Sequence, residues 1–255
     1  MGTREAYEPG QFSWVELATR DADAAKAFYA ELFGWDYDDR PIGGGAVYSM
    51  ARLQDRWVGA LYASEQAAPH WNCYVTVGSA EDAAAACAQA GGTVAAEPFD
   101  VLTSGRMTVV EDPTGAALCL WEPREHPGAG LVNAPGALAW NDLYTPDVPA
   151  AVAFYTAALG WEVEPVPGAP GGRHAVRAAG RPNGGITGMP PGSEATPSHW
   201  LAYFGTADAA ASVEAVRRAG GHVVTGPLEV PAGAFAVCAD PQGAVFGLVA
   251  SDFDD

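Results

Sequence analysis

Apolar and polar residues alternate in FSWVELAT near the N-terminus, with the period of two that is typical of a short β-strand. The next stretch, Asp21–Trp35, reads DADAAKAFYAELFGW and has the apolar spacing of a helix. One face of this helix is expected to carry Ala24, Ala27, Phe28 and Leu32. Asp21 is a suitable N-cap, and Gly34 can end the helix because glycine readily adopts the left-handed conformation.

Three short strands are expected after this helix, and the same order of elements then begins again. The three strands lie near Trp35–Asp38, Ala46–Arg52 and Trp57–Tyr62. The second series has a strand at Trp71–Val77, a helix at Ala80–Ala90 that stops at a Gly-Gly pair, and strands near Thr93–Ala95, Arg106–Glu111 and Ala116–Glu122. The first half of the chain therefore predicts two consecutive βαβββ modules.

The second half of the chain repeats the first. Asp147–Trp161 reads DVPAAVAFYTAALGW and shares eight of its fifteen positions with Asp21–Trp35. PHWNCYVTV corresponds to SHWLAYFGT, and EDPTGAALCLWEP corresponds to ADPQGAVFGLVAS. The three pairs are offset by 126, 129 and 128 residues, so the order of motifs is kept and only loops differ in length. We predict domains over residues 1–125 and 137–255, joined by a Pro- and Gly-rich linker over residues 126–136.

These motifs together resemble the vicinal oxygen chelate superfamily, which includes glyoxalase I, extradiol dioxygenases and bleomycin-resistance proteins. The resemblance rests on AFYAELFGW after a strand and an Asp cap, on the Gly-Gly pair, and on DPTG or DPQG before a last strand. It covers nearly the whole chain as two tandem glyoxalase-like domains. The resemblance implies an α+β fold, with four βαβββ modules paired into two domains whose curled, U-shaped mixed sheets surround a cleft.

The composition indicates which partners, which location and which cysteine chemistry to expect. Lys plus Arg number 13 and Asp plus Glu number 31, and the net charge of −18 repels nucleic-acid phosphates and anionic membranes. The N-terminal sequence MGTREAYEPG has no secretory pattern and no apolar run is long enough to span a membrane, so we expect a cytoplasmic protein. Four cysteines, Cys73, Cys87, Cys119 and Cys238, form no CxxC pair and are expected to be buried free thiols.

The resemblance also implies where a metal ion would be held, and the residues at those positions are poor ligands. Metal-using members take ligands from the first strand, from the first strand after the midpoint and from the last strand. The corresponding residues are Trp14, Asn72 and Cys119 in the first copy, and Trp140, Leu201 and Gly247 in the second. Trp, Leu and Gly offer no side-chain donor for a metal, and Asn with Cys is a weak set. We therefore predict no metal and no other cofactor.

An alternative metal site would use the two histidines that each precede a Trp. His70 and His199 could combine with Glu16 and Asp142 to hold iron, manganese or zinc. The other interpretation is that each histidine lies at a strand end and hydrogen-bonds a neighbouring carbonyl or carboxylate.

Without a metal, the inner faces of the predicted sheets are rich in aromatic residues. The first copy contributes Trp14, Glu16, Asn72, Tyr74, Cys119 and Trp121, and the second contributes Trp140, Asp142, Tyr144, Leu201, Tyr203 and Val249. Tyr48, Trp57 and Tyr62 are expected to add aromatic surface. Such walls suit a flat, largely apolar ligand that bears a hydroxyl, an amine or a cation, although half of these residues could serve the core alone.

Glu16 and Asp142 occupy equivalent positions in the two copies and are the candidate catalytic residues. A carboxyl among aromatic side chains is desolvated, which raises its pKa and suits proton transfer. The alternative is that each acid pairs with a nearby arginine, for which Arg52, Arg106 and Arg177 are candidates.

Two functions from different classes follow from these observations. The first is a metal-independent protein that binds a small, aromatic molecule, as bleomycin-resistance-like proteins do. The alternative is an enzyme of the isomerase, epimerase, lyase or dioxygenase/hydroxylase type, which uses Glu16 or Asp142 as acid or base, or a noncanonical metal. In either case we expect a small-molecule partner and a monomer or homodimer.

Overall fold

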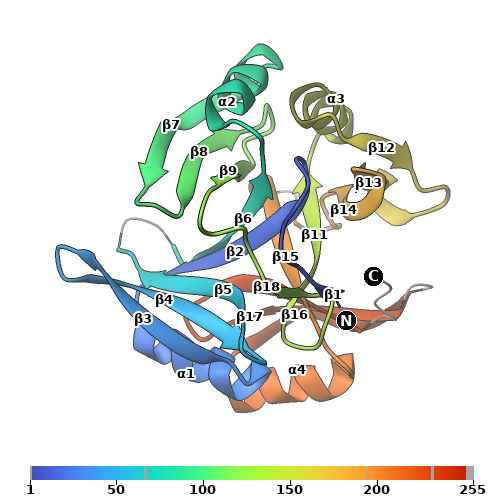
Figure 1. Cartoon of the computed structure of the whole chain (residues 1–255). Helices are drawn as coiled ribbons and strands as arrows, with labels where there is room; N and C mark the ends of the chain where they lie inside the picture. The colour runs from blue at the N-terminus through green and yellow to red at the C-terminus, as the bar shows by residue number, and fades with distance from the viewer. Residues whose placement is uncertain (1, 66–67, 194, 231–232, 251–255) are drawn as a thin grey trace.

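The computed structural model describes residues 2–65, 68–193, 195–230 and 233–250 and contains two eight-stranded mixed sheets (Figure 1). The strands of the first sheet are β2 (Phe12–Thr19), β3 (Asp36–Gly43), β4 (Ala46–Leu53), β5 (Arg56–Ala63), β6 (His70–Thr76), β7 (Thr93–Val101), β8 (Gly105–Glu111) and β9 (Ala117–Pro123). Those of the second sheet are β11 (Leu138–Thr145), β12 (Glu162–Pro165), β13 (His174–Ala178), β14 (Arg181–Gly188), β15 (His199–Gly205), β16 (His222–Val230), β17 (Gly233–Ala239) and β18 (Val245–Ala250). The helices are α1 (Ala22–Phe33), α2 (Ala80–Gln89), α3 (Val148–Leu159) and α4 (Ala209–Arg218), with a short 3-10 turn at Pro170–Gly172.

The two modules of each half share one sheet. The strand order is β3-β4-β5-β2-β6-β9-β8-β7 in the first half and β12-β13-β14-β11-β15-β18-β17-β16 in the second. The first strands of the two modules, β2 and β6, pair antiparallel, whereas β2 pairs with β5 and β6 with β9 in parallel. The second sheet repeats these pairings, so the predicted α+β fold of four βαβββ modules is confirmed.

The helix boundaries follow the predicted caps. The carboxylate of Asp21 accepts a hydrogen bond from the amide of Ala24, and Gly34 ends α1 in the left-handed conformation at φ 73°. The expected apolar face of α1 was wrong in part, because Ala24 and Ala27 are exposed. The buried positions of α1 are Ala25, Phe28 and Tyr29. The two aromatic side chains at the third and fourth position after Ala25 determine which face turns inward.

The largest apolar core lies between the two sheets and belongs to both domains. Helix α1 packs near α4, and α2 packs near α3, so that each helix meets one from the other half (Figure 1). Phe28 of α1 faces Phe246 of β18 with ring centroids 6.2 Å apart. Gly221 and Gly92 leave space for Phe28 and Phe154 respectively, because a Cβ there would approach the opposing ring to 3.1 and 2.6 Å. The halves therefore fold onto each other through their helix-bearing faces.

The repeated FY and DP motifs meet across this shared core. The Tyr29 hydroxyl donates to Asp240 of the second domain at 3.3 Å and accepts from the indole N–H of Trp71 at 3.2 Å. In the other copy the Trp200 indole donates to Tyr155 at 2.8 Å, and burial together with the Asp112 charge raises the pKa of Tyr155. The most similar segments of the two copies thus contribute to the contact between the domains.

The predicted linker is ordered against the first sheet. Its β10 strand (Leu131–Val132) pairs with β1 (Gly2–Thr3) near the N-terminus. The amide of Ala129 donates to the carbonyl of Ser13, and the amide of Gly130 donates to the carbonyl of Trp57. The linker therefore covers part of the first sheet on the face that points away from the shared core. Within the described residues, no helix combines the length and apolar character needed to cross a membrane.

Candidate functional site

The side chains of the first sheet that point away from the shared core form a second apolar cluster, which we call the first inner face. It contains Trp14, Met50, Ala60, Tyr74, Cys119 and Trp121, joined by Ala129 and Val132 of the linker. Tyr7, Tyr48, Trp57, Val101, Met107 and Val109 pack against it and are only partly buried. The β-ladder places Trp14 opposite Tyr74 and Glu16 opposite Asn72, so alternate residues of β2 and β6 reach this face together.

Glu16 lies at the centre of the first inner face and has only uncharged hydrogen-bonding partners. The Tyr48 hydroxyl donates to Glu16 Oε2 at 2.8 Å, and the Asn72 amide donates to Glu16 Oε1 at 3.4 Å. Tyr74 contributes another hydrogen bond to the carboxyl. The Trp14 indole donates to the Tyr48 hydroxyl at 3.1 Å and extends this chain of donors.

Burial raises the pKa of Glu16, and the hydrogen bonds from Tyr74, Tyr48 and Asn72 offset only part of this effect. The His70 charge lowers the pKa slightly, but burial is the largest effect, so the protonated form is favoured relative to a glutamate in water. Burial also raises the pKa of Cys119 well above its ordinary value, and the Glu16 charge adds to the rise. Cys119 is therefore held as a thiol and lacks the activation that a nucleophilic cysteine needs.

The equivalent acid of the second sheet is held in an ion pair. Asp142 is 4% exposed and binds the guanidinium of Arg173 through two hydrogen bonds of 2.7 and 2.9 Å. The Trp140 indole donates to Asp142 Oδ1 at 2.8 Å. A Cβ at Gly185 would lie 2.5 Å from Asp142 Oδ1 and 2.6 Å from the guanidinium, so this pair depends on glycine at that position.

Two tyrosines complete the second inner face, which we define by Trp140, Asp142, Tyr144, Arg173 and Tyr203. The hydroxyls of Tyr144 and Tyr203 lie 2.9 Å apart and share a hydrogen bond. The Tyr203 ring occupies the space beside Gly247, because a Cβ built there would lie 2.0 Å from the ring. Two further expected members, Leu201 and Val249, are buried and half-buried respectively.

The expected metal positions do not fit a metal ion. The place of a last-strand ligand in the second copy, Gly247, is filled by the Tyr203 ring. Trp14 and Trp140 offer only indole N–H donors, which are directed to Tyr48 and Asp142. Among the residues that the structure describes, no three His, Cys, Asp or Glu side chains come together where they could hold a metal ion.

The two histidines of the alternative metal site have local structural contacts. The Nδ1 atom of His70 lies 2.8 Å from the carbonyl of Ala68, and that of His199 lies 2.8 Å from the carbonyl of Pro197. These geometries confirm the interpretation that each histidine hydrogen-bonds a neighbouring carbonyl. Cys73, Cys87, Cys119 and Cys238 are buried and free, as the sequence predicts.

The expected arginine partners of the two acids were wrong. Arg52 pairs with Asp36, and Arg106 pairs with Glu81 and Asp100. The guanidinium of Arg177 donates to the carbonyl of Gly180. These three arginines lie on strands and have other partners, whereas Arg173 precedes β13 in the Gly-rich stretch PGAPGGR, where strand alternation gives no signal.

A second residue that the sequence did not indicate is His126 of the linker. Its imidazole packs edge-to-face with Trp14, with ring centroids 4.5 Å apart, and its backbone carbonyl accepts the Trp121 indole N–H at 2.9 Å. The only sequence signal was its position between two domains.

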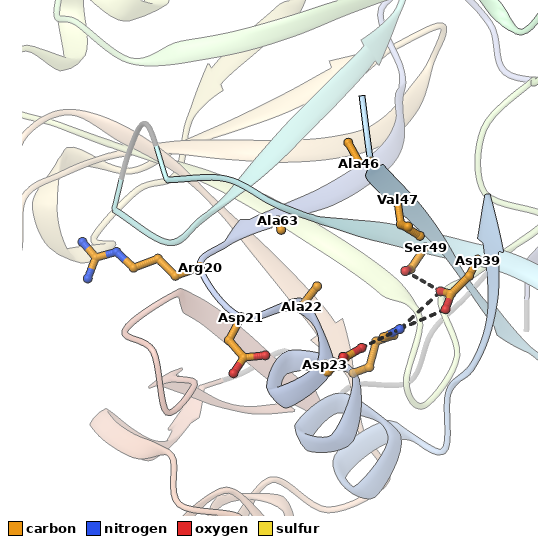
Figure 2. Close-up of a pocket in the computed structure, with 11 residues that line it drawn as sticks. Arg20, Asp21, Ala22, Asp23, Asp39, Ala46, Val47, Ser49 and Ala63 are labelled. Carbon is orange, nitrogen blue, oxygen red and sulfur yellow. Dashed lines mark hydrogen bonds and ion pairs between the residues drawn. The ribbon is translucent and has the colours of Figure 1, made fainter. Parts of the chain in front are cut away.

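An open hollow of about 450 Å³ lies elsewhere, between the start of α1 and the β3–β4 hairpin (Figure 2). Its polar groups are paired with one another: Asp39 accepts from Ser49 at 2.6 Å and from Lys26 at 3.1 Å, and Lys26 also pairs with Asp23 at 2.9 Å. The hollow contains none of the predicted site residues, and Lys26, Asp23 and Asp39 in its lining are paired with one another.

The chain has clear relatives. A family model described as the Glyoxalase/Bleomycin resistance protein/Dioxygenase superfamily matches residues 11–120 and 137–248. The protein named "Putative glyoxylase CFP32" from Mycobacterium tuberculosis is 41% identical over 256 residues, which cover 98% of each chain. The "Anthracycline biosynthesis protein DauV" from a Streptomyces species is 30% identical over 274 residues and is matched over 95% of this chain and 94% of its own.

Solved structures share the fold. The Mn(II)-bound glyoxalase from Novosphingobium aromaticivorans has a TM-score of 0.67 at 20% identity, with 97% of this chain and 85% of the other covered. The 2,3-dioxygenase LapB from Pseudomonas sp. KL28 has a TM-score of 0.65 at 16% identity, with 96% and 94% covered. At these identities the similarity concerns the fold, and the chemistry of each site depends on its own residues.

Proposed function

The chain belongs to the glyoxalase/bleomycin resistance protein/dioxygenase superfamily, and we propose that it binds a small aromatic molecule on its first inner face without a metal ion. The observation that carries this proposal is the environment of Glu16, a buried carboxyl with neutral partners among aromatic side chains. Aromatic walls favour a flat apolar molecule, and a buried carboxyl can form a hydrogen bond with a polar group on it.

The first inner face is favoured over the second because its acid is not neutralised. Asp142 forms an ion pair with Arg173, whereas Glu16 forms no ion pair with any described residue and is hydrogen-bonded by neutral groups. Tyr48 and Tyr62 are stacked with ring centroids 6.3 Å apart and remain half-buried, so they offer aromatic surface that a ligand can cover. Because the acid and its aromatic surroundings come from one half of one chain, no second subunit is required.

The names of the relatives are compatible with a small-molecule ligand. One is named as a glyoxylase and another for anthracycline biosynthesis, and anthracyclines are polycyclic aromatic molecules. We extend only the general class, a small aromatic molecule, to this chain.

The proposal is tested by titrating the protein with 2-naphthol in a calorimeter, using the equivalent tryptophans of the two copies as a matched pair. Trp14→Leu should weaken binding about tenfold, because it removes an aromatic wall of the first inner face. Trp140→Leu should leave the affinity unchanged, and near-ultraviolet circular dichroism should show that both variants keep their fold. Absence of binding by the wild-type protein, or equal weakening in both variants, would contradict the proposal.

The raised pKa of Glu16 favours a second candidate, an enzyme that moves a proton on a carbon acid. In this function Glu16 takes a proton from carbon next to a carbonyl and returns it to another position. The test is proton NMR of a ketone-bearing aromatic compound in D₂O, in which catalysed loss of the carbon-bound proton signal reports exchange. Glu16→Gln should abolish exchange, whereas Glu162→Gln, which changes an exposed acid of β12, should leave it intact.

A further inference from the structure

The linker brings a histidine into the wall of the first inner face. His126 is fixed on both sides of its backbone, because its amide donates to the carbonyl of Ser104 at 3.0 Å and its carbonyl accepts from the Trp121 indole at 2.9 Å. Its imidazole lies 4.5 Å from the Trp14 ring at 85° and 6.1 Å from the Trp121 ring at 67°. The ring therefore has a defined position between two tryptophans of the face.

The Nε2 atom of His126 is buried and has no hydrogen-bond partner in the described residues. A buried polar atom without a partner is uncommon and unfavourable. Because Nε2 is already removed from water in the free protein, a ligand group that hydrogen-bonds to it does not incur that desolvation cost again. Burial lowers the pKa of His126 to about 4, and the Arg40 charge contributes to this lowering. The imidazole is therefore neutral at neutral pH and has one nitrogen that can accept a hydrogen bond.

The groups around this nitrogen limit what it can bind. Arg40 is the charged residue whose field reaches His126, and its guanidinium lies over the Trp57 ring at 5.1 Å. The two rings that contact the imidazole, Trp14 and Trp121, are aromatic. A cationic ligand would therefore meet Arg40 repulsion, and a fully apolar ligand would leave Nε2 unpaired. A neutral aromatic hydroxyl satisfies both conditions.

We propose that His126 is a specificity residue of the first inner face, which accepts a hydrogen bond from a hydroxyl group on the aromatic ligand. This inference rests on the proposed binding function and adds the ligand class, hydroxylated in preference to alkylated aromatic molecules. Trp14 is 3% exposed and packs against the imidazole. Its indole donates to Tyr48, which in turn donates to Glu16, so the hydroxyl end of the ligand lies at the linker side of the face.

The experiment compares 2-naphthol with its methyl ether, 2-methoxynaphthalene, by calorimetry on the full chain. The two probes share a ring system and differ in the hydrogen-bond donor. The wild-type protein should bind 2-naphthol about fivefold more tightly than the ether, as expected for one neutral hydrogen bond. His126→Phe should keep the contact with Trp14 and lose this preference, and His126→Gln, whose amide oxygen can accept, should recover part of it. His222→Phe changes an exposed histidine and should behave as wild type.

A readout independent of folding in the variants is the ¹⁵N chemical shift of His126 in the wild-type protein, which 2-naphthol should move and the ether should not. A preference that survives in His126→Phe, or an unmoved ¹⁵N shift at saturating 2-naphthol, would overturn the assignment of His126 while leaving the proposed binding function intact. Absence of wild-type binding to both probes would overturn both.

Discussion

Tyr48 on β4 and Arg173, which directly precedes β13, stand at corresponding positions relative to the inner acids of the two sheets. Tyr48 lies two residues before Met50, which aligns with Glu16 across β5. Arg173 lies two residues before Ala175, which aligns with Asp142 across β14. The same position therefore supplies a neutral hydroxyl to one acid and a guanidinium to the other. This difference gives Glu16 a neutral hydrogen-bond donor and holds Asp142 in an ion pair.

The first prediction concerns the pH dependence of stability in Glu16→Gln. Because the pKa of Glu16 is raised in the folded protein, the folded state binds more protons than the unfolded state above the unfolded pKa. The wild-type protein should therefore lose stability as pH rises from about 4 through the folded pKa, by about 1.4 kcal/mol for each unit of pKa difference. Glu16→Gln should not show this loss. Urea unfolding between pH 4 and pH 8 measures the difference.

The two proteins should have similar stability at the acidic end of this series, and the variant should be the more stable at pH 8. An equal difference between variant and wild type at pH 4 and pH 8 would mean that folding does not raise the pKa of Glu16, and a larger deficit of the variant at pH 8 would mean that folding stabilises the charged form. Either result would contradict the prediction.

The second prediction is that Asp142→Asn destabilises the protein at neutral pH. The substitution leaves Arg173 without its ion-pair partner, and the side chain of Arg173 is only 29% exposed. Breaking a buried pair by removing one partner costs about 3 kcal/mol, the lower end of the usual range, since part of the guanidinium reaches solvent. Urea unfolding at pH 7 measures it. Asp36→Asn is the matched control, because it breaks the exposed pair with Arg52 and should cost less than about 1 kcal/mol.

The fold was predictable to a large extent because the repeated motifs are structural. The caps Asp21 and Gly34, the strand FSWVELAT and the order of the βαβββ modules all follow from local residue preferences. The inner-face residues of β2 and β6 also followed from strand alternation, since a period of two places Trp14 and Glu16 on one side.

The partners of the site residues were not predictable in the same way. Arg173 and His126 lie outside regular strands, one before β13 and the other in the linker, where no periodicity assigns a side chain to a face. The pairing of Tyr29 with Asp240 joins residues 211 positions apart, and local patterns carry no information about such contacts. Tertiary contacts therefore decide which of the two equivalent acids keeps neutral neighbours.

The third prediction tests the contact between the domains. Tyr29→Phe removes a hydroxyl that donates to Asp240 and accepts from Trp71, so both buried groups lose a partner. We expect a loss of about 1 to 3 kcal/mol in the free energy of unfolding. Tyr37→Phe is the control, because the buried Tyr37 hydroxyl has no hydrogen-bond partner among the described residues, and its removal should cost less than about 0.5 kcal/mol or stabilise. Equal effects of the two substitutions would argue against a specific interdomain contact.

The fourth prediction concerns the space beside Gly247. Gly247→Ala should destabilise the protein by about 1 to 3 kcal/mol, because the new methyl group overlaps the Tyr203 ring. In a Tyr203→Ala background the same substitution should cost much less, and this coupling is measured in a double-mutant cycle of thermal unfolding. Gly78→Ala, at a position with open space around it, should cost little. Additive effects of the Gly247 and Tyr203 substitutions would show that the ring does not fill the place of a last-strand ligand.

Metal-independent binding is tested most directly by calorimetric titration of 2-naphthol into wild-type protein before and after dialysis against EDTA, with metal content measured on both samples. Binding on the first inner face without a metal predicts one site with the same dissociation constant in both samples. Loss of binding after EDTA treatment, with recovery on addition of Mn²⁺, Fe²⁺ or Zn²⁺, would contradict it.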